Sequence, residues 1–231
     1  ALSEPLRDVR RSLPVFEHRS GLLEALASLT SEAPCLVVEG ETGSGKSTQV
    51  PQYILEEACA TGKAVDVVVT QPRRIAAIGV ADRIAAERGE AVGEVVGYAI
   101  RGEARACERT ALLFNTTGVC LRRLQEDGLA GVTHVVVDEV HERTLEADFL
   151  LLALRELVRL RNARGEPPLK ILLMSATMRD GFVHCIVLEY GHSTSRPIWD
   201  ALRATHSTAP AAASPRAIAG NSLYRMQAWA N

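Results

Sequence analysis

The chain contains few aromatic residues and no apolar run long enough to cross a membrane. Aromatic residues make up 4 % of its 231 residues, whereas hydrophobic residues make up 47 %. The core therefore has to be built from Val, Leu, Ile and Ala, which favours a parallel sheet with helices on both faces. No run reaches the roughly 18 apolar residues of a membrane-spanning helix, and the N-terminus has no charged-then-apolar signal pattern. We therefore expect no membrane partner.

Paired cysteines and an excess of basic residues are also absent. The five cysteines are scattered, and no two of them have metal-ligand spacing. We expect reduced thiols and a cytoplasmic location, with the nucleus as the alternative. The formal net charge is −2, from 26 Lys and Arg against 28 Asp and Glu. A nucleic-acid partner would need a local basic strip, for which Arg73-Arg74 and Arg122-Arg123 are candidates, although such pairs are usually solvated.

Apolar strands alternate with amphipathic helices along most of the chain. The segments expected to form strands are 35–39, 64–70, 95–100, 111–115, 134–137 and 169–174. The segments expected to form helices are 21–29, 47–60, 75–88, 118–126 and 145–160. This alternation predicts an α/β fold with a doubly wound, mostly parallel sheet. In such folds, ligands bind at the carboxyl ends of the strands.

The sequence predicts three parts of unequal character. Residues 1–19 form a mixed, charged N-terminal extension that Pro5 and Pro14 interrupt, and residues 20–180 form the α/β domain. Residues 181–231 contain only two acidic residues and lose all periodicity. Such a segment predicts an irregular, disordered tail.

The segment Gly40–Ser47 carries the strongest motif of the chain. It reads Gly-Glu-Thr-Gly-Ser-Gly-Lys-Ser, a full match to the phosphate-binding loop G-x-x-x-x-G-K-[ST]. The segment lies between an expected strand and an expected helix, as the motif requires. In such a loop, backbone N–H groups surround the phosphates, while Lys46 would reach the β- and γ-phosphates and Ser47 would bind Mg²⁺. The motif predicts a nucleoside triphosphate with Mg²⁺; a glycine-rich turn that binds nothing is the alternative.

Two adjacent acidic residues follow another apolar strand. Asp138 ends the run 135–137 and would direct its carboxylate toward the metal. Glu139 is placed to orient and deprotonate a water for attack on the γ-phosphate. Paired acids after a strand are more often a solvated turn, but the phosphate loop favours the catalytic interpretation. His141, which alone would be interpreted as structural, would then sense the state of the γ-phosphate.

Five motifs together resemble those of the DEAH-box RNA helicases. They are Gly40–Thr48 (motif I), Thr70–Ala77 (Ia), Thr116–Arg122 (Ib), Asp138–Arg143 (II) and Ser175–Thr177 (III). Their order and spacing also agree with that family. Each motif follows the end of an expected strand, so all five would converge on one edge of the sheet. The resemblance implies a P-loop NTPase domain of the RecA-like type, the first of two in the family.

The resemblance implies a role for each matching residue. Those that would hold ATP and Mg²⁺ are Gly43, Ser44, Gly45, Lys46, Ser47 and Thr48, with Arg83 stacked on the base and Asp138 on the metal. Those that would act in catalysis are Lys46, Asp138, Glu139 and His141. Those that would contact the RNA backbone are Arg73, Arg74, Thr116, Thr117 and Gly118. Those that would couple the nucleotide site to RNA movement are Ser175 and Thr177.

The resemblance covers about residues 13–178 and only one of the two RecA-like domains. Motifs IV to VI are missing from the chain, and with them the arginine finger of motif VI. Loss of such an arginine costs on the order of 10³–10⁵ in rate. We therefore expect an RNA helicase-type ATPase that binds ATP weakly, hydrolyses it slowly and does not unwind RNA on its own.

The resemblance also suggests a branch of the family and leaves two alternatives. The segments 105–108, 115–118 and 124–128 look closest to the branch that contains a helicase of translation initiation on the small ribosomal subunit. The ribosome or another ribonucleoprotein is therefore an expected partner. One alternative is a module that binds RNA or a protein without turnover. The other, a small-molecule phosphotransferase, leaves motifs Ia and III unexplained.

Overall fold

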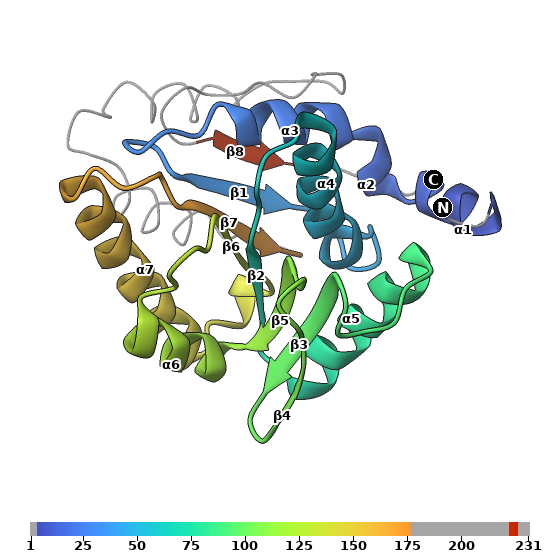
Figure 1. Ribbon diagram of the computed structural model, residues 1–231. Helices are drawn as coiled ribbons and strands as arrows, with labels where there is room; N and C mark the ends of the chain where they lie inside the picture. Colours follow the sequence, from blue (N-terminus) through green and yellow to red (C-terminus); the bar gives the residue numbers. More distant parts are fainter. Residues whose placement is uncertain (1–3, 177–221, 226–231) are drawn as a thin grey trace.

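The computed structural model describes residues 4–176 and 222–225 as an α/β fold (Figure 1). Its strands are β1 (Cys35–Glu39), β2 (Val67–Gln71), β3 (Val96–Ile100), β4 (Glu103–Arg105), β5 (Leu112–Thr116), β6 (His134–Val137), β7 (Lys170–Ser175) and β8 (Ser222–Arg225). Its helices are α1 (Glu4–Arg11), α2 (Pro14–Glu17), α3 (Arg19–Ala27), α4 (Lys46–Thr61), α5 (Arg74–Arg88), α6 (Thr117–Asp127) and α7 (Leu145–Ala163), with a 3₁₀ turn η1 (Val140–Glu142). None of these helices is long and apolar enough to span a membrane.

The strands form one sheet in the order β4-β3-β5-β2-β6-β7-β1-β8. Every neighbouring pair is parallel except β3 and β4. Because parallel neighbours need crossover connections, helices alternate with strands along the chain and lie on both faces of the sheet. The predicted doubly wound, mostly parallel fold is confirmed.

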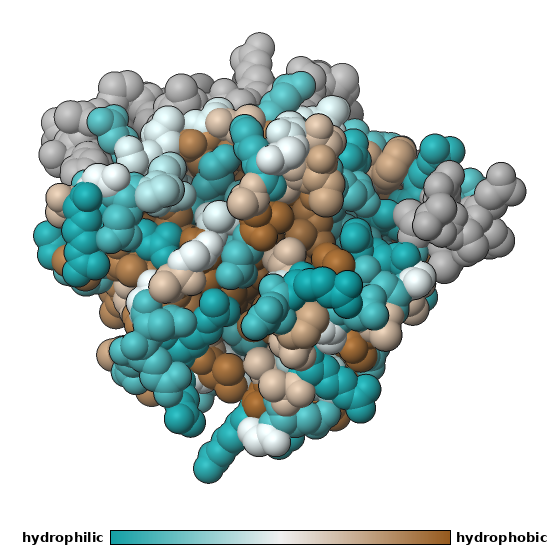
Figure 2. Space-filling model, in the orientation of Figure 1, coloured by the Kyte–Doolittle hydropathy of each residue, from teal (hydrophilic) through white to brown (hydrophobic). Residues whose placement is uncertain are grey.

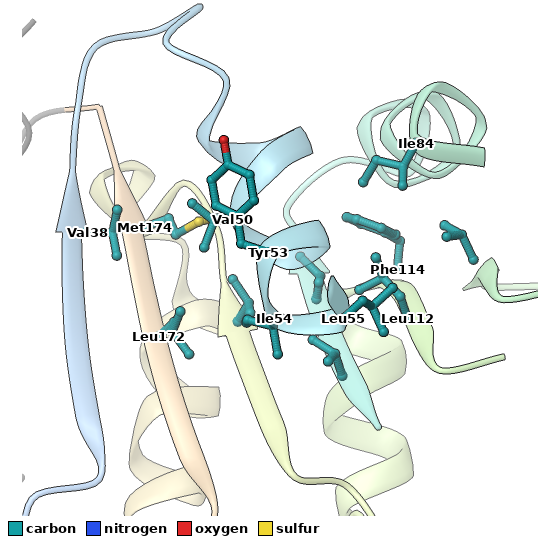
Figure 3. Close-up of a cluster of buried hydrophobic side chains, with 14 of the residues drawn as sticks. Val38, Val50, Tyr53, Ile54, Leu55, Ile84, Leu112, Phe114, Leu172 and Met174 are labelled. Atoms are coloured by element: carbon teal, nitrogen blue, oxygen red, sulfur yellow. The ribbon is translucent and has the colours of Figure 1, made fainter. Parts of the chain in front are cut away.

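Two apolar layers hold the helices on the sheet. The first layer joins α2, α3, α4 and α5 to one face, and the second joins α6 and α7 to the other. Figure 3 shows part of the first layer, with Val50 and Ile54 of α4 among Leu172 and Met174 of β7 and Phe114 of β5. As the low aromatic content predicts, the strands contribute mainly Val, Leu and Ile. On the side of the molecule that Figure 2 shows, hydrophilic residues cover most of the surface.

The carboxyl ends of five strands lie at the same edge of the sheet. Strands β1 and β7 end side by side, with Glu39 opposite Ser175. Strands β2 and β5 likewise end with Gln71 opposite Thr116. The backbone N–H of Asp138, just beyond β6, donates to the carbonyl of Thr70 in β2 at 3.1 Å. The starts of the five polar motifs therefore gather at one edge, as the sequence predicts.

Two α-helices and two strands have no counterpart in the sequence prediction. Helices α1 and α2 lie in the expected extension, and strand β8 lies inside the expected tail, next to β1. The remainder of the tail lies outside the described residues. Strand β4 is only three residues long and all three are exposed, so it has no inward-facing apolar residue to reveal it. It pairs with β3 through a turn at Gly102, whose φ of +83° suits glycine.

His134 at the start of β6 gives the fold a calculable sensitivity to acid. The ring is partly buried, and its Nδ1 lies 2.8 Å from the Thr133 hydroxyl. Burial, and then the charge of Lys170, lower the pKa of His134 to about 4. Between this value and the ordinary pKa near 6.5, the unfolded chain binds a proton that the folded chain does not. Folding stability is therefore present at neutral pH and lost as the pH falls through this window.

We expect His134→Gln to reduce the acid sensitivity of the fold. Lowering the pH from 7 to 5 should cost the wild-type chain about 2 kcal/mol of unfolding free energy through this histidine alone. Other groups also titrate, so the quantity to compare is the pH dependence of the two proteins, measured by urea unfolding. An identical pH dependence in both would contradict the assignment.

Candidate active site

The phosphate-binding loop connects β1 to the N-terminus of α4. Gly43 and Gly45 have φ values of +84° and +91°, which side-chain-bearing residues rarely adopt. A Cβ on Gly45 would also lie 2.9 Å from the Cδ1 of Leu13. The loop thus needs glycine at Gly45 for both its backbone angle and its packing. It ends at a 16-residue helix, whose N-terminal N–H groups and dipole favour an anion.

Lys46 folds back along this loop. Its side chain is buried, with the residue 7 % exposed. The Nζ atom donates to the carbonyl of Gly40, to that of Glu41 at 2.8 Å and to the Ser44 hydroxyl at 3.4 Å. Burial lowers the pKa of Lys46, and the carboxylates of Asp138 and Glu139 act in the opposite direction. The loop therefore holds a partly desolvated cation whose carbonyl partners can be exchanged for phosphate oxygens.

Asp138 and Ser47 meet where a metal is expected. Asp138 is only 4 % exposed, and the Ser47 hydroxyl hydrogen-bonds to its carboxylate. Its Oδ2 accepts from Gln71 Nε2 at 2.7 Å, and its Oδ1 accepts from the backbone N–H of Glu139 at 2.9 Å. Burial raises the pKa of Asp138, against the effect of these hydrogen bonds. A serine hydroxyl beside a carboxylate is an oxygen donor set that suits Mg²⁺, so the residues fit the predicted ion.

Glu139 occupies a strained position beside Asp138. Its φ of +54° places a residue other than glycine in the left-handed region, a conformation that clusters at functional sites. The chain then turns through η1, and His141 Nδ1 lies 3.3 Å from Glu139 Oε2. Burial, and then the charge of Asp138, raise the pKa of Glu139, which makes it a better proton acceptor. His141 is therefore placed to respond to the charge on Glu139.

The predicted RNA contacts differ in accessibility. Arg73 is 75 % exposed and pairs with Glu142 Oε1 at 3.0 Å, and Arg74 at the start of α5 is exposed as well. Gly118 is exposed, and Thr116 is partly exposed at the cap of α6. Thr117 is buried. The two arginines and the glycine thus form the accessible part of this set.

Of the two predicted coupling residues, the structure describes Ser175 only. Ser175 is fully buried at the end of β7, and its carbonyl accepts the backbone N–H of Gly40 at 3.1 Å. This bond joins the strand directly to the phosphate loop. Thr177 lies outside the described residues.

Arg83 is held by a glutamate that sequence reasoning did not identify. Its Nε donates to Glu87 Oε1 at 2.7 Å, and the Arg83 side chain remains 53 % exposed. Gln71, which orients Asp138, was likewise not identified as a site residue. A polar side chain at the end of an apolar strand was the available signal for Gln71, and the spacing of four residues from Arg83 was the signal for Glu87.

The segment that carries these motifs matches known proteins. Residues 23–184 match the family model of the DEAD/DEAH box helicases. The chain is 52 % identical over 172 residues to the DExH-box ATP-dependent RNA helicase DExH3 of Arabidopsis thaliana, and 50 % identical over 176 residues to DExH1 of the same plant. It is 46 % identical over 193 residues to the human ATP-dependent RNA helicase DHX29.

These relatives are much longer than the matched segment. The similarity covers 73 %, 75 % and 78 % of this chain but only 14 %, 17 % and 13 % of DExH3, DExH1 and DHX29. The chain thus spans less than a fifth of the length of the relatives it matches. The comparison therefore identifies a domain, and the activity of the whole proteins does not transfer with it.

Proposed function

Since the chain belongs to the DEAD/DEAH box helicase family, we propose that it binds ATP with Mg²⁺, hydrolyses the ATP and contacts the backbone of RNA. The observation that carries this proposal is the convergence of Lys46, Ser47 and Asp138 at one sheet edge, with Glu139 adjacent. A cation, two oxygen donors and a carboxylate base are the groups that phosphoryl transfer to water requires.

The arrangement supports a division of labour among these residues. The loop N–H groups and Lys46 would bind the β- and γ-phosphates, and Ser47 and Asp138 would hold Mg²⁺. When bound, Mg²⁺ neutralises charge that develops on the phosphate oxygens. Glu139 would orient a water and accept its proton as the oxygen bonds to the γ-phosphorus and the bond to ADP breaks. In the family pattern a second RecA-like domain completes this site, so we propose that residues 20–180 on their own turn over ATP slowly.

The exposed arginines support contact with RNA phosphates. The Arg73–Glu142 pair is largely solvent-exposed on the arginine side, and such ion pairs contribute little stability. A phosphate can therefore replace Glu142 as the partner of Arg73 at small cost. Contacts of this kind give affinity without reading base sequence. A cytoplasmic ribonucleoprotein such as the ribosome remains our proposal for the source of the RNA.

We expect the double variant Arg73→Ala/Arg74→Ala to bind RNA with a weaker salt dependence. Each lost phosphate contact lowers the slope of log K against log salt by about 0.7 for single strands, so two contacts give a change of about 1.4. The measurement is the fluorescence anisotropy of a labelled single-stranded oligonucleotide over a series of salt concentrations. Arg159→Ala, which removes an exposed arginine of α7 that pairs with Glu156, is the matched control.

The rate of ATP hydrolysis with and without RNA separates the two candidate functions. Stimulation by RNA in the wild-type chain, reduced in the double arginine variant, is expected for an RNA-dependent ATPase. RNA binding with no change in rate would favour the alternative, a module that holds RNA or a protein partner without turnover. An unchanged salt slope in the double variant would contradict the assignment of Arg73 and Arg74.

A further inference from the structure

A series of hydrogen-bonded side chains connects the N-terminal helix α1 to Arg83 in α5. Arg10 donates from Nη2 to Glu56 Oε1 and from Nε to Gln49 Oε1, both at 2.6 Å. Gln49 then donates from Nε2 to Glu87 Oε2 at 2.9 Å. Glu87 in turn accepts from Arg83. Donors and acceptors alternate along this series of side chains, so each side chain fixes the orientation of the next.

Glu87 is the member of this hydrogen-bonded series that contacts Arg83. It is only 2 % exposed, yet it accepts hydrogen bonds from Gln49, Arg83 and Gln52, the last at 2.8 Å. Burial alone would raise the pKa of Glu87, but these hydrogen bonds outweigh it and lower the pKa below its ordinary value. The site thus holds a buried carboxylate in its charged form. Such a group fixes a guanidinium in place more strongly than a neutral acceptor does.

Gln49 has its amide oriented from both ends. Its oxygen accepts from Arg10, whereas its nitrogen donates to Glu87 and lies 3.1 Å from the Thr48 hydroxyl. An amide that loses its partner on one end can rotate and present oxygen where nitrogen stood. Oxygen facing the carboxylate of Glu87 would be repelled. Arg10 and Glu87 therefore hold the Gln49 amide in the same orientation from its two ends, and Arg10 adds to the preference for the donor side facing Glu87.

The same N-terminal segment also packs against the phosphate loop. The backbone N–H of Val15 donates to the carbonyl of Ser44 at 3.1 Å. The side chains of Leu13 and Val15 lie against the face of Gly45 that carries no Cβ. The segment that holds Arg10 thus contacts the loop directly and reaches Arg83 through two further side chains. It borders both the phosphate end of the site and the arginine expected at the base.

We propose that Arg10, acting through Gln49 and Glu87, is a positioning residue that fixes Arg83 for contact with the base of the bound nucleotide. The inference rests on the proposed function, because it takes ATP as the ligand, and on the contact with the base that the family resemblance implies for Arg83. Glu87 occupies the Nε of Arg83 and leaves half of its side chain exposed. A planar guanidinium held at its root stacks on a base without reading the base edge. The N-terminal segment is accordingly part of the nucleotide site.

The test compares two ligands that differ in the presence of a base. Binding of Mg-ATP and of Mg-tripolyphosphate to the full 231-residue chain is measured by calorimetry for Arg10→Lys, Glu87→Gln and Arg83→Ala. Each variant should lower the affinity for ATP about three- to tenfold, the worth of one lost hydrogen-bonding contact. The affinity for tripolyphosphate should stay at the wild-type value, because the phosphate loop is intact. Arg159→Lys, at an exposed pair on α7, is the matched control.

A double variant provides a second readout that needs ATP alone. If Arg10 acts only through Arg83, adding Arg10→Lys to Arg83→Ala should not lower the affinity for ATP further. Additive losses, equal losses for ATP and tripolyphosphate, or unchanged ATP affinity in any of the three single variants would overturn the proposal. Failure of the proposed function has a different signature, since Lys46→Ala would then leave the affinity for both ligands unchanged.

Discussion

Lys46→Ala should lower the affinity for Mg-ATP by at least about a hundredfold. The Lys46 side chain lies buried within the phosphate loop, and Lys46 is the only lysine of that loop. Charge-assisted hydrogen bonds are each worth about 1.5–3 kcal/mol, so losing two of them to the phosphates, about 3 kcal/mol or more, corresponds to a hundredfold or more. The expected loss is smaller for ADP, because ADP offers Lys46 the β-phosphate contact alone.

The measurement is the titration of a fluorescent ATP analogue with each purified protein. Lys63→Ala is the matched control, because Lys63 is exposed in the loop after α4 and far along the chain from the site. Alanine also removes hydrogen bonds that Lys46 makes to the loop itself. Circular dichroism and a thermal melt therefore accompany the titration. A folded Lys46→Ala chain with unchanged ATP affinity would refute the phosphate-loop assignment.

The sequence predicted a strand or helix correctly where the residues of that element form a recognisable pattern by themselves. The buried strands of the sheet are apolar runs, so β1 and β6 were predicted with the bounds that the structure shows. Helix α1 has no apolar run of this kind, because most of its residues are charged, and its Arg10 pairs with Glu56, 46 residues away. The pattern of α1 alone does not contain this partner. Sequence patterns therefore predicted six of the eight described strands and missed a helix that packs through a distant partner.

The same distinction applies to the site. Lys46 and Asp138 belong to short sequence motifs, so the neighbouring residues alone predict their roles. Gln71 contacts Asp138, 67 residues away, and Glu87 contacts Gln49, 38 residues away, in addition to its near neighbour Arg83; only the fold brings these distant partners together. The RNA role of Thr117 stays a prediction, and its burial means that contact through the side chain would require the start of α6 to shift.

Glu139→Gln should abolish hydrolysis while leaving ATP binding intact. Glutamine keeps the shape of the side chain but cannot accept the proton of the attacking water, and loss of a general base typically costs 10²–10⁴ in rate, on the order of 3–5 kcal/mol. The affinity should be unchanged or higher, because the raised pKa of Glu139 reflects burial and repulsion by Asp138. A neutral side chain removes that repulsion beside the bound phosphates.

Single-turnover hydrolysis of radiolabelled ATP at saturating protein measures this step apart from binding. Glu156→Gln, at an exposed glutamate of α7, controls for the loss of one negative charge. A Glu139→Gln chain that hydrolyses ATP at the wild-type rate would exclude Glu139 as the base. A chain that loses binding and hydrolysis together would instead assign Glu139 a role in holding the strained turn after β6, because φ at this position is +54°. The pair of outcomes thus distinguishes chemistry from local structure at Glu139, where a left-handed backbone lies next to the metal carboxylate of Asp138.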